Sequence, residues 1–358
     1  MNKRSNKLTT ETNQLTKTRL SMKKVILSLA LALTATMAFA QDTPLEISGS
    51  GDLYYKYDFS KTANIPTSFA SDQNSLSLGL IDIALKKTTG KTSFVGEISF
   101  GPRGQFQSIL NSDGTYDELG ANSFHIQNLY ATYAATEKLS FTAGFMGTFI
   151  GYEVISPLAN FHYSTSYLFT NGPFQNAGIK ANYAISDKVG LMVGAFNDAW
   201  NSYTADAFKG LNAVGAQLSL APTENINAYI NFMDGSVSGT IVDLTATFKL
   251  SDKFLLGLNA ADYSNEGDVG YSGVAVYPSY KVNEHFGLGL RGEYFDYKEG
   301  SGDASVTALT FSANLKSGGL TFIPEFRLDN GSEEYFVNSD GAPTKSASQL
   351  SLALVYGF

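Results

Sequence analysis

Apolar and polar residues alternate with a period of two in this sequence, and this rhythm limits the fold more than any other feature. Residues 177–185, 225–232 and 320–329 place apolar side chains at every second position, with mostly polar or small side chains between them. Successive side chains of a β-strand point to opposite faces, so the alternation predicts strands with one apolar and one polar face. We therefore expect an all-β chain.

A short turn motif recurs between these segments. A small polar residue, an acidic residue and a Lys, Asn or His precede an apolar residue within residues 134–141, 184–191, 221–228, 250–257 and 282–289. Asp, Asn and Ser favour tight turns because their side chains bond to nearby backbone groups. Each copy of the motif is predicted to connect two strands of a hairpin.

The alternating segments and the turns together predict about sixteen strands of roughly 9 to 13 residues. Their expected ranges are 46–58, 75–86, 92–100, 123–134, 138–146, 174–185, 188–198, 211–220, 225–233, 240–250, 253–262, 271–282, 285–297, 305–316, 319–329 and 347–358.

Strand length separates the two architectures that use such strands. Strands of a soluble sandwich or propeller average about 5 or 6 residues, whereas a membrane-spanning strand needs about 9 to 11. An even strand count, short turns at one rim and longer loops at the other are typical of outer-membrane barrels. We predict a transmembrane antiparallel β-barrel with short periplasmic turns and longer extracellular loops.

The N-terminal region carries an export signal. The stretch "MKKVILSLALALTATMAFAQ" has a basic start, an apolar run and a small-x-small site at residues 38–40. This pattern predicts a signal peptide over residues 1–40, cleaved before Gln41, with translation starting at Met22. A membrane anchor needs about 20 apolar residues, and this run is shorter. Residues 41–358 are expected to form one barrel domain in the outer membrane of a Gram-negative bacterium.

The last residues support the same compartment. "SQLSLALVYGF" presents a large apolar row on one side of a strand and ends on an aromatic residue. In a closed barrel the final strand pairs with the first and turns its apolar face to lipid. Tyr356 and Phe358 are predicted to act as a signal for the outer-membrane assembly machinery.

Composition excludes several classes of function. The chain has no cysteine, which excludes disulfides and thiol catalysis. Its net charge is −8, and the predicted signal peptide is itself basic, so nucleic-acid binding is not expected. Lysines gather at the short turns and acidic residues in the longer connections.

The segment from 141 to 183 resembles a known family. Its motif residues are Gly151, Tyr152, Glu153, Asn160, Tyr163, Ser164, Ser166, Phe169, Pro173 and Gly178. They are similar to the signature of the OmpL-like β-barrel porins of Gram-negative outer membranes, and the likeness extends over most of the mature chain. The sequence departs from the signature at Thr165, where the family often has Arg, and at Asn176 and Ala177. The resemblance implies a porin fold. If the family's Arg lines the pore, its replacement by Thr165 means that the solute selectivity of the family need not apply to this chain.

The connection from 146 to 172 is a candidate constriction. In general porins a loop at this place narrows the lumen, so the resemblance suggests a constriction containing Glu153, His162, Tyr163 and Tyr167. A loop packed at the surface is the alternative. Charged residues at inward-facing strand positions are candidate pore-lining residues, because charge on the lipid face costs a few kcal/mol. These are Asp52, Lys56, Asp82, Glu97, Lys180, Arg291, Glu293, Glu325 and Arg327.

The sequence thus predicts a porin that passes small hydrophilic solutes or ions passively, with a weak cation preference from its acidic excess. A substrate-specific channel, for a sugar or another nutrient, and a plugged structural or adhesion barrel remain alternatives. A hydrolase is a further alternative, for which "ANSFHIQN" around His125 is the only local grouping. We expect no catalytic residue, metal or cofactor. The expected partners are membrane lipid, lipopolysaccharide, the assembly machinery, solutes and two further copies in a homotrimer.

Overall fold

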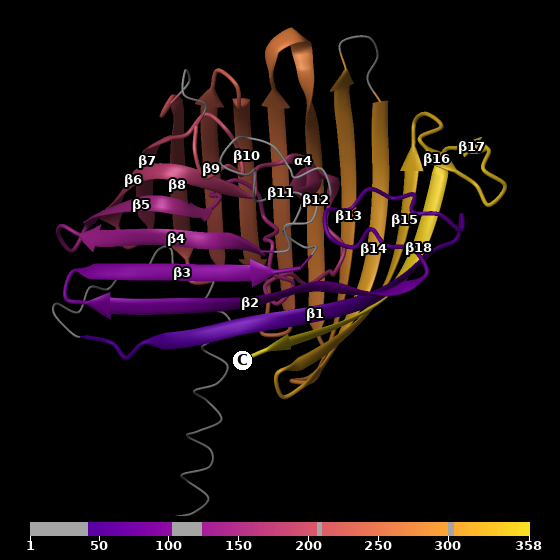
Figure 1. The fold of residues 1–358 in the computed structure, drawn as a ribbon, viewed down its shortest axis with the longest axis horizontal. Helices are drawn as coiled ribbons and strands as arrows, with labels where there is room; N and C mark the ends of the chain where they lie inside the picture. The colour runs from indigo at the N-terminus through magenta and orange to yellow at the C-terminus, as the bar shows by residue number, and fades with distance from the viewer. Residues whose placement is uncertain (1–41, 102–123, 206–209, 300–303) are drawn as a thin grey trace, which may run out of the picture. The chain divides into compact units, whose positions relative to one another are not determined.

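The computed structural model describes residues 42–101, 124–205, 210–299 and 304–358. The predicted signal peptide, at residues 1–40, lies outside these ranges. Within them the chain is almost entirely β-strand (Figure 1).

The first eight strands are β1 (Glu46–Asp58), β2 (Ser75–Thr89), β3 (Thr92–Phe100), β4 (Phe124–Ala134), β5 (Leu139–Gly147), β6 (Gln175–Ser186), β7 (Val189–Phe196) and β8 (Ala213–Thr223). The next seven are β9 (Ile226–Gly235), β10 (Gly239–Lys249), β11 (Phe254–Ser264), β12 (Val269–Lys281), β13 (Phe286–Glu299), β14 (Ala304–Ser317) and β15 (Leu320–Gly331). The chain ends with β16 (Phe336–Val337), β17 (Pro343–Thr344) and β18 (Ser346–Gly357).

Sixteen of the described strands form one closed antiparallel barrel. Neighbours along the chain pair with one another from β1 to β15, and β18 closes the barrel between β15 and β1. At the seam, Phe358 N donates to Gly49 O at 3.1 Å and Gly49 N donates to Phe358 O at 3.2 Å. The predicted fold class and strand count are confirmed.

The five copies of the turn motif all connect strands at the same rim. They join β4 to β5, β6 to β7, β8 to β9, β10 to β11, and β12 to β13. At the opposite rim the longer connections include residues 59–74, 148–174, 197–212 and 332–345. Three small elements inside connections were not predicted: the helix α4 (Tyr167–Asn171), the 3-10 turn η1 (Glu266–Asp268) and the hairpin of β16 with β17.

The outer face of the barrel is apolar. Leu76 and Leu78 of β2 are 74% and 69% exposed, and exposed leucines recur on β14, β15 and β18. Aromatic side chains near the short turns also point outward, the placement that is typical of a girdle at the membrane interface: Phe94, Tyr133, Phe141 and Tyr183. In the described part of the chain, no helix is long and apolar enough to cross a membrane.

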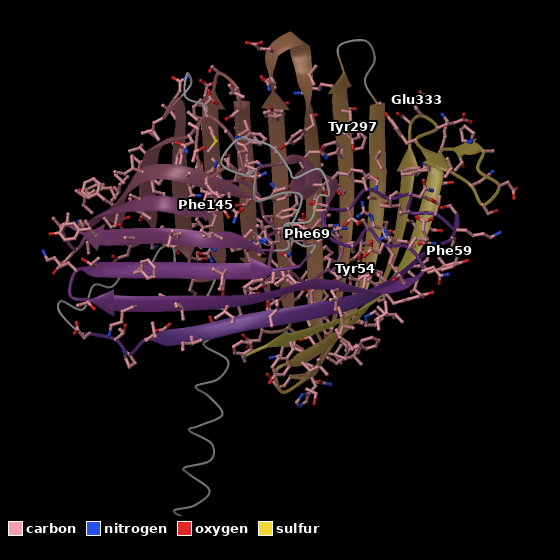
Figure 2. The ribbon with its side chains drawn as sticks, viewed as in Figure 1. Tyr54, Phe59, Phe69, Phe145, Tyr297 and Glu333 are labelled. Carbon is pink, nitrogen blue, oxygen red and sulfur yellow. The ribbon has the colours of Figure 1, made fainter. Side chains whose placement is uncertain are left out.

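The inner face is packed rather than bare. Residues 59–74 and 148–174 both turn inward, so Phe69 and Tyr54 are buried inside the barrel while Phe59 stays exposed at the rim (Figure 2). An apolar cluster joins Ile150 and Leu168 of the second loop to inward-facing Phe295 on β13. The barrel therefore encloses a second, internal core formed by its own loops.

Candidate functional site in the barrel lumen

The connection between β5 and β6, residues 148–174, lies against the inner wall. Tyr163 and Tyr167 are each 1% exposed. Tyr163 Oη donates to Asp52 Oδ2 on β1 at 2.5 Å, and Tyr167 Oη donates to Asp329 Oδ2 on β15 at 2.7 Å. Of the two placements that the sequence left open, a loop in the lumen and a loop on the surface, the structure has the first.

Two glutamates of the wall bind the backbone of this loop. Glu325 on β15 and Glu293 on β13 each accept hydrogen bonds from two consecutive loop amides, at 2.8 to 3.0 Å. The amides are those of Tyr163 and Ser164 for Glu325, and of Tyr167 and Leu168 for Glu293. Hydrogen bonds to an ionised group are about twice as strong as neutral ones. The two carboxylates therefore hold the loop at two points.

Arg291 on β13 binds the same loop through both side chain and backbone. Its Nη1 donates to Glu153 Oε1 at 2.7 Å and to Ser164 O at 2.6 Å, and its Nη2 donates to Thr165 O at 3.2 Å. The guanidinium is fully buried. A planar group with five donors can satisfy several carbonyls at once, and this suits arginine to the position.

Arg327 on β15 reaches the loop at the same carbonyl. Its Nη1 donates to Thr165 O at 2.8 Å, while its Nε and Nη2 pair with Asp329 at 2.8 and 2.9 Å. The guanidinium lies 5.1 Å from the ring centre of Tyr167, within cation–π range. Thr165, where the sequence departs from the family signature, is therefore the residue on which both wall arginines converge.

The two ends of the loop are also fixed by carboxylates. Gly151 has a φ of +87°, which a residue with a side chain rarely adopts, and its amide donates to Asp243 Oδ1 on β10 at 3.0 Å. Glu153 Oε2 accepts from both N and Oγ of Ser166 at 2.7 Å, and Ser166 caps α4. The alternation in β10 indicates that the Asp243 side chain points inward, but its hydrogen bond to the loop was not predicted.

The charges of this wall are thus engaged by the loop. Glu153, Arg291, Glu293, Glu325 and Arg327 are all 7% exposed or less. A charge on a pore wall sets ion preference when it faces the water that ions cross. The four strand residues among them, Arg291, Glu293, Glu325 and Arg327, lie at inward positions that the sequence predicted, and they contact the loop rather than solvent.

Two other predicted lining residues, on strands β3 and β6, keep partial exposure. Lys180 on β6 and Glu97 on β3 are half-buried, and Glu97 Oε2 accepts from Asn128 Nδ2 at 2.6 Å. Asp52 and Asp82 face inward but are buried, at 6% and 7% exposed. Other inward-facing residues of β3 to β9, such as Gln127 and Met233, are buried, at 6% and 0% exposed.

His162 lies deep in this assembly. Its Nδ1 is 2.7 Å from Ser312 Oγ and 4.0 Å from Glu325 Oε2, and its ring faces Tyr277 at 6.4 Å. Burial, together with the positive charge of nearby Arg291, holds the pKa of His162 well below its usual value. The imidazole is therefore neutral in the folded protein at pH 7.

This depressed pKa predicts a stability that falls in acid. Below about pH 6.5 the unfolded chain binds a proton at His162 that the folded chain does not bind, which lowers the free energy of unfolding. The slope from this group is at most about 1.4 kcal/mol per pH unit. We expect His162→Gln to remove that part of the slope in urea unfolding between about pH 7.5 and about pH 5.5. An unchanged slope would contradict the assignment.

Residues 59–74 form a second inward loop that the sequence did not predict. Thr67 Oγ1 lies 3.1 Å from Thr165 Oγ1, and Ser68 Oγ donates to Thr170 Oγ1 at 3.0 Å. Phe69 packs on Phe169 with ring centres 5.7 Å apart. Alternation of apolar and polar residues predicts strands. A connection without alternation does not indicate whether it turns into the lumen or away from it.

Other predicted residues lie away from this assembly. Tyr356 and Phe358 are 52% and 60% exposed on the outer face, beside the seam. His125 is buried, with Nε2 3.0 Å from Gln127 Oε1. The neighbours proposed for it in the hydrolase alternative, Asn122 and Ser123, lie outside the described residues.

A family comparison agrees with the barrel fold. Residues 44–358 match the family described as "Putative beta-barrel porin-2, OmpL-like". The chain belongs to this OmpL-like porin family. Membership confirms the resemblance and places the protein in the outer membrane of a Gram-negative bacterium. Among curated proteins no sequence relative matches the chain.

Solved structures with the same fold are outer-membrane barrels of low sequence identity to this porin-family chain. The channel DcaP of Acinetobacter baumannii is 15% identical, with a TM-score of 0.60, 90% of this chain covered and 99% of that chain. OmpF of Salmonella typhi, in complex with daunomycin, is 13% identical, with a TM-score of 0.60 and coverages of 89% and 100%. OmpT of Vibrio cholerae, in a trimer form, is 10% identical, with a TM-score of 0.55 and coverages of 88% and 99%. These likenesses establish the fold.

Proposed function

We propose that this protein is a passive channel for small hydrophilic solutes or ions, in which residues 148–174 form the constriction. The observation that carries the proposal is that charged wall residues hold the loop, while two other charged residues of the inner wall keep partial exposure. The loop is fixed to β13 and β15 by charged groups, whereas Lys180 on β6 and Glu97 on β3 remain partly exposed. Sixteen or more strands leave room for an aqueous channel, and a loop held to one side narrows it without closing it. Family membership supports the same function.

The proposed ion preference is weakly cationic. The chain has 33 acidic and 25 basic residues, and clefts lined by one sign of charge concentrate ions of the opposite sign. Two of the wall charges bound to the loop, Arg291 and Arg327, contribute little to this field because Glu153 and Asp329 neutralise them. The preference is therefore expected to come from the connections at the rim and from residues such as Glu97.

Single-channel recording of the refolded mature protein in planar bilayers tests the proposal. We expect steady ohmic openings and a reversal potential of cationic sign under a salt gradient. Lys180→Glu should shift the reversal potential further toward cations. Lys188→Glu, in the exposed turn of the same hairpin, is the matched control and should leave it unchanged. A folded barrel that stays silent would overturn the channel and favour the plugged structural barrel.

Several properties of a passive porin follow as parts of the same proposal. The protein works without a catalytic residue, metal or cofactor, and export depends on a signal peptide cleaved before Gln41. Tyr356 and Phe358 serve as the assembly signal, and lipid and lipopolysaccharide surround the exposed apolar face. A homotrimer is the proposed assembly, supported by the trimer form of the structurally similar OmpT. A channel selective for one nutrient is the second candidate.

A further inference from the structure

Four side chains on the inner wall leave polar atoms without partners. Among the described residues, Lys56 Nζ, Asp58 Oδ2, Ser351 Oγ and both polar atoms of the Gln349 amide make no hydrogen bond. All four side chains are buried, with 1% exposure or less. Lys56 also makes no ion pair with any residue that the structure describes.

The four residues form one compact patch across two strands. Lys56 faces Ser351, and Asp58 faces Gln349, in the antiparallel register of β1 with β18. Residues two apart on a strand point to the same face, so all four side chains share the inner wall. The patch therefore combines an ammonium, a carboxylate oxygen, an amide and a hydroxyl.

Apolar clusters border the patch on both sides along the strands. On one side Tyr54 and Ala353 cluster with Ala70, and on the other Ala347 belongs to the cluster that includes Ile65. Ile65 and Ala70 both come from the inward loop 59–74. This loop therefore seals the patch by contributing one residue to each apolar border.

Sealing the patch without a ligand is costly. An unsatisfied buried polar group costs about 1 to 3 kcal/mol, and a charged group costs more. Buried polar groups in proteins are almost always paired with protein, water or ligand. The carboxylate of Asp58 does not solve the problem, because only its Oδ1 is used, by Ser60 N and Oγ at 2.9 and 2.7 Å.

The loop over the patch makes fewer hydrogen bonds with charged groups than the constriction loop, among them that from Tyr54 Oη on β1 to Asp72 Oδ2 at 3.0 Å. Its side-chain hydrogen bonds to residues 148–174 join neutral hydroxyl and amide groups of Thr67, Ser68, Thr165 and Thr170. Neutral hydrogen bonds contribute about 0.5 to 1.5 kcal/mol, and those to charged groups about 1.5 to 3. We therefore expect residues 59–74 to leave the wall before residues 148–174.

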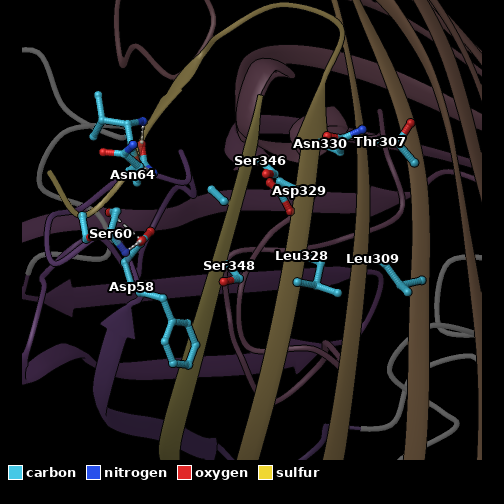
Figure 3. Close-up of a pocket in the computed structure, with 15 residues that line it drawn as sticks. Asp58, Ser60, Asn64, Thr307, Leu309, Leu328, Asp329, Asn330, Ser346 and Ser348 are labelled. Carbon is cyan, nitrogen blue, oxygen red and sulfur yellow. Dashed lines mark hydrogen bonds between the residues drawn. The ribbon is translucent and has the colours of Figure 1, made fainter. Parts of the chain in front are cut away.

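A cavity at the extracellular rim adjoins the patch at Asp58, and its lining continues onto the outward-facing Leu309 and Leu328. It has a volume of about 550 Å³ and is lined in part by Asp58, Ser60 and Asn64 (Figure 3). Asp58 thus belongs to both the rim cavity and the patch, whereas Lys56, Gln349 and Ser351 do not line the cavity.

We propose that Lys56, Asp58, Gln349 and Ser351 form a binding site for small zwitterionic solutes such as α-amino acids, exposed when residues 59–74 leave the wall. A carboxylate of the solute pairs with Lys56 and Ser351. Its ammonium group pairs with the free oxygens of Asp58 and Gln349. Such a solute satisfies four of the five unpaired atoms, and its carboxylate can also accept from the fifth, Gln349 Nε2, while it adds no net charge to the lumen. The assignment rests on the proposed channel function for its biological role, but its chemistry is independent of conduction.

Cysteine labelling tests the site without requiring a conducting channel. The chain contains no cysteine, so Ser351→Cys introduces a single thiol while keeping Lys56 and Asp58. In the folded barrel a water-soluble thiosulfonate should modify this thiol when the loop opens. L-Alanine should slow the labelling severalfold, whereas propionate and ethylammonium, which each carry one of its charged groups, should slow it much less. Ser140→Cys, half-buried on the inner face of β5, should label without protection.

Each outcome bears directly on the site. Adding Lys56→Gln or Asp58→Asn to Ser351→Cys should abolish protection by L-alanine. Equal protection by propionate would make the patch an anion site and overturn the zwitterion assignment. A folded barrel that does not label, or that labels without protection by any solute, would overturn the site itself. Protection in a barrel that is silent in bilayers would refute the channel and leave the site standing.

Discussion

Replacing residues 149–173 by a two-residue turn is expected to raise the single-channel conductance severalfold. Thr148 N donates to Phe174 O at 3.0 Å, so β5 and β6 are already close enough for a tight hairpin. The removed segment fills the lumen with buried side chains such as Tyr163 and Tyr167. Without it, Arg291, Glu293, Glu325 and Arg327 would face water and carry ion selectivity directly. Planar-bilayer recording of the folded variant measures both effects.

A second deletion is the control for this experiment. Residues 339–342 lie at the exposed tip of the connection that carries β16 and β17. Removing them shortens a rim loop and should leave the conductance unchanged. If the constriction deletion folded into a heat-modifiable barrel with native conductance, residues 148–174 would not be the constriction.

Arg291→Ala is expected to lower the free energy of unfolding by about 3 to 5 kcal/mol, the usual cost of leaving a buried charge without its partner. The substitution leaves Glu153 buried beside Ser166 and frees the carbonyls of Ser164 and Thr165. Urea unfolding of the barrel in detergent measures the loss. Lys249→Ala breaks an ion pair between exposed residues, Lys249 and Asp252, and should have no measurable effect.

A double-variant cycle separates the ion pair from the packing. Combining Arg291→Ala with Glu153→Ala removes both charges, so the double variant should lose clearly less than the sum of the two single losses. Additive losses would mean that the pair contributes nothing beyond its separate contacts. A gain in conductance with Arg291→Ala would show in addition that the loop is released.

The strands could be predicted because their signal is local. Alternation and turn motifs placed the first strand at 46–58, and β1 is Glu46–Asp58. The seventh strand was expected to continue to 198 but ends at Phe196. Asp198 leaves the strand because its Oδ1 accepts from Ser238 N at 2.8 Å and from Val237 N at 3.1 Å, in the turn between β9 and β10. A contact with a distant turn shortened a strand that local pattern extended.

The site could be predicted only in part. Parity correctly indicated that Glu325 and Arg327 face inward, because period two fixes the face of every strand residue. Parity does not distinguish a face that meets water from one that meets a loop. The partner of Glu325 is the backbone of Tyr163, 162 residues earlier in the chain, and backbone amides carry no sequence signal. The sequence likewise does not reveal that Lys56 Nζ lacks a partner, because this depends on which distant residues surround it.

The attachments of the constriction loop also set an order of folding. Its residues bind residues of β13 and β15 that lie 125 to 162 positions later in the sequence. These partners are therefore synthesised after the loop, and contacts between residues so far apart in sequence form slowly. The loop cannot dock until those strands are in place, and the β1–β18 seam that encloses it requires the final residue. The newly assembling barrel must therefore pass through a state whose interior is wide and wet. Docking of the loop narrows the lumen only after the second half of the wall has formed.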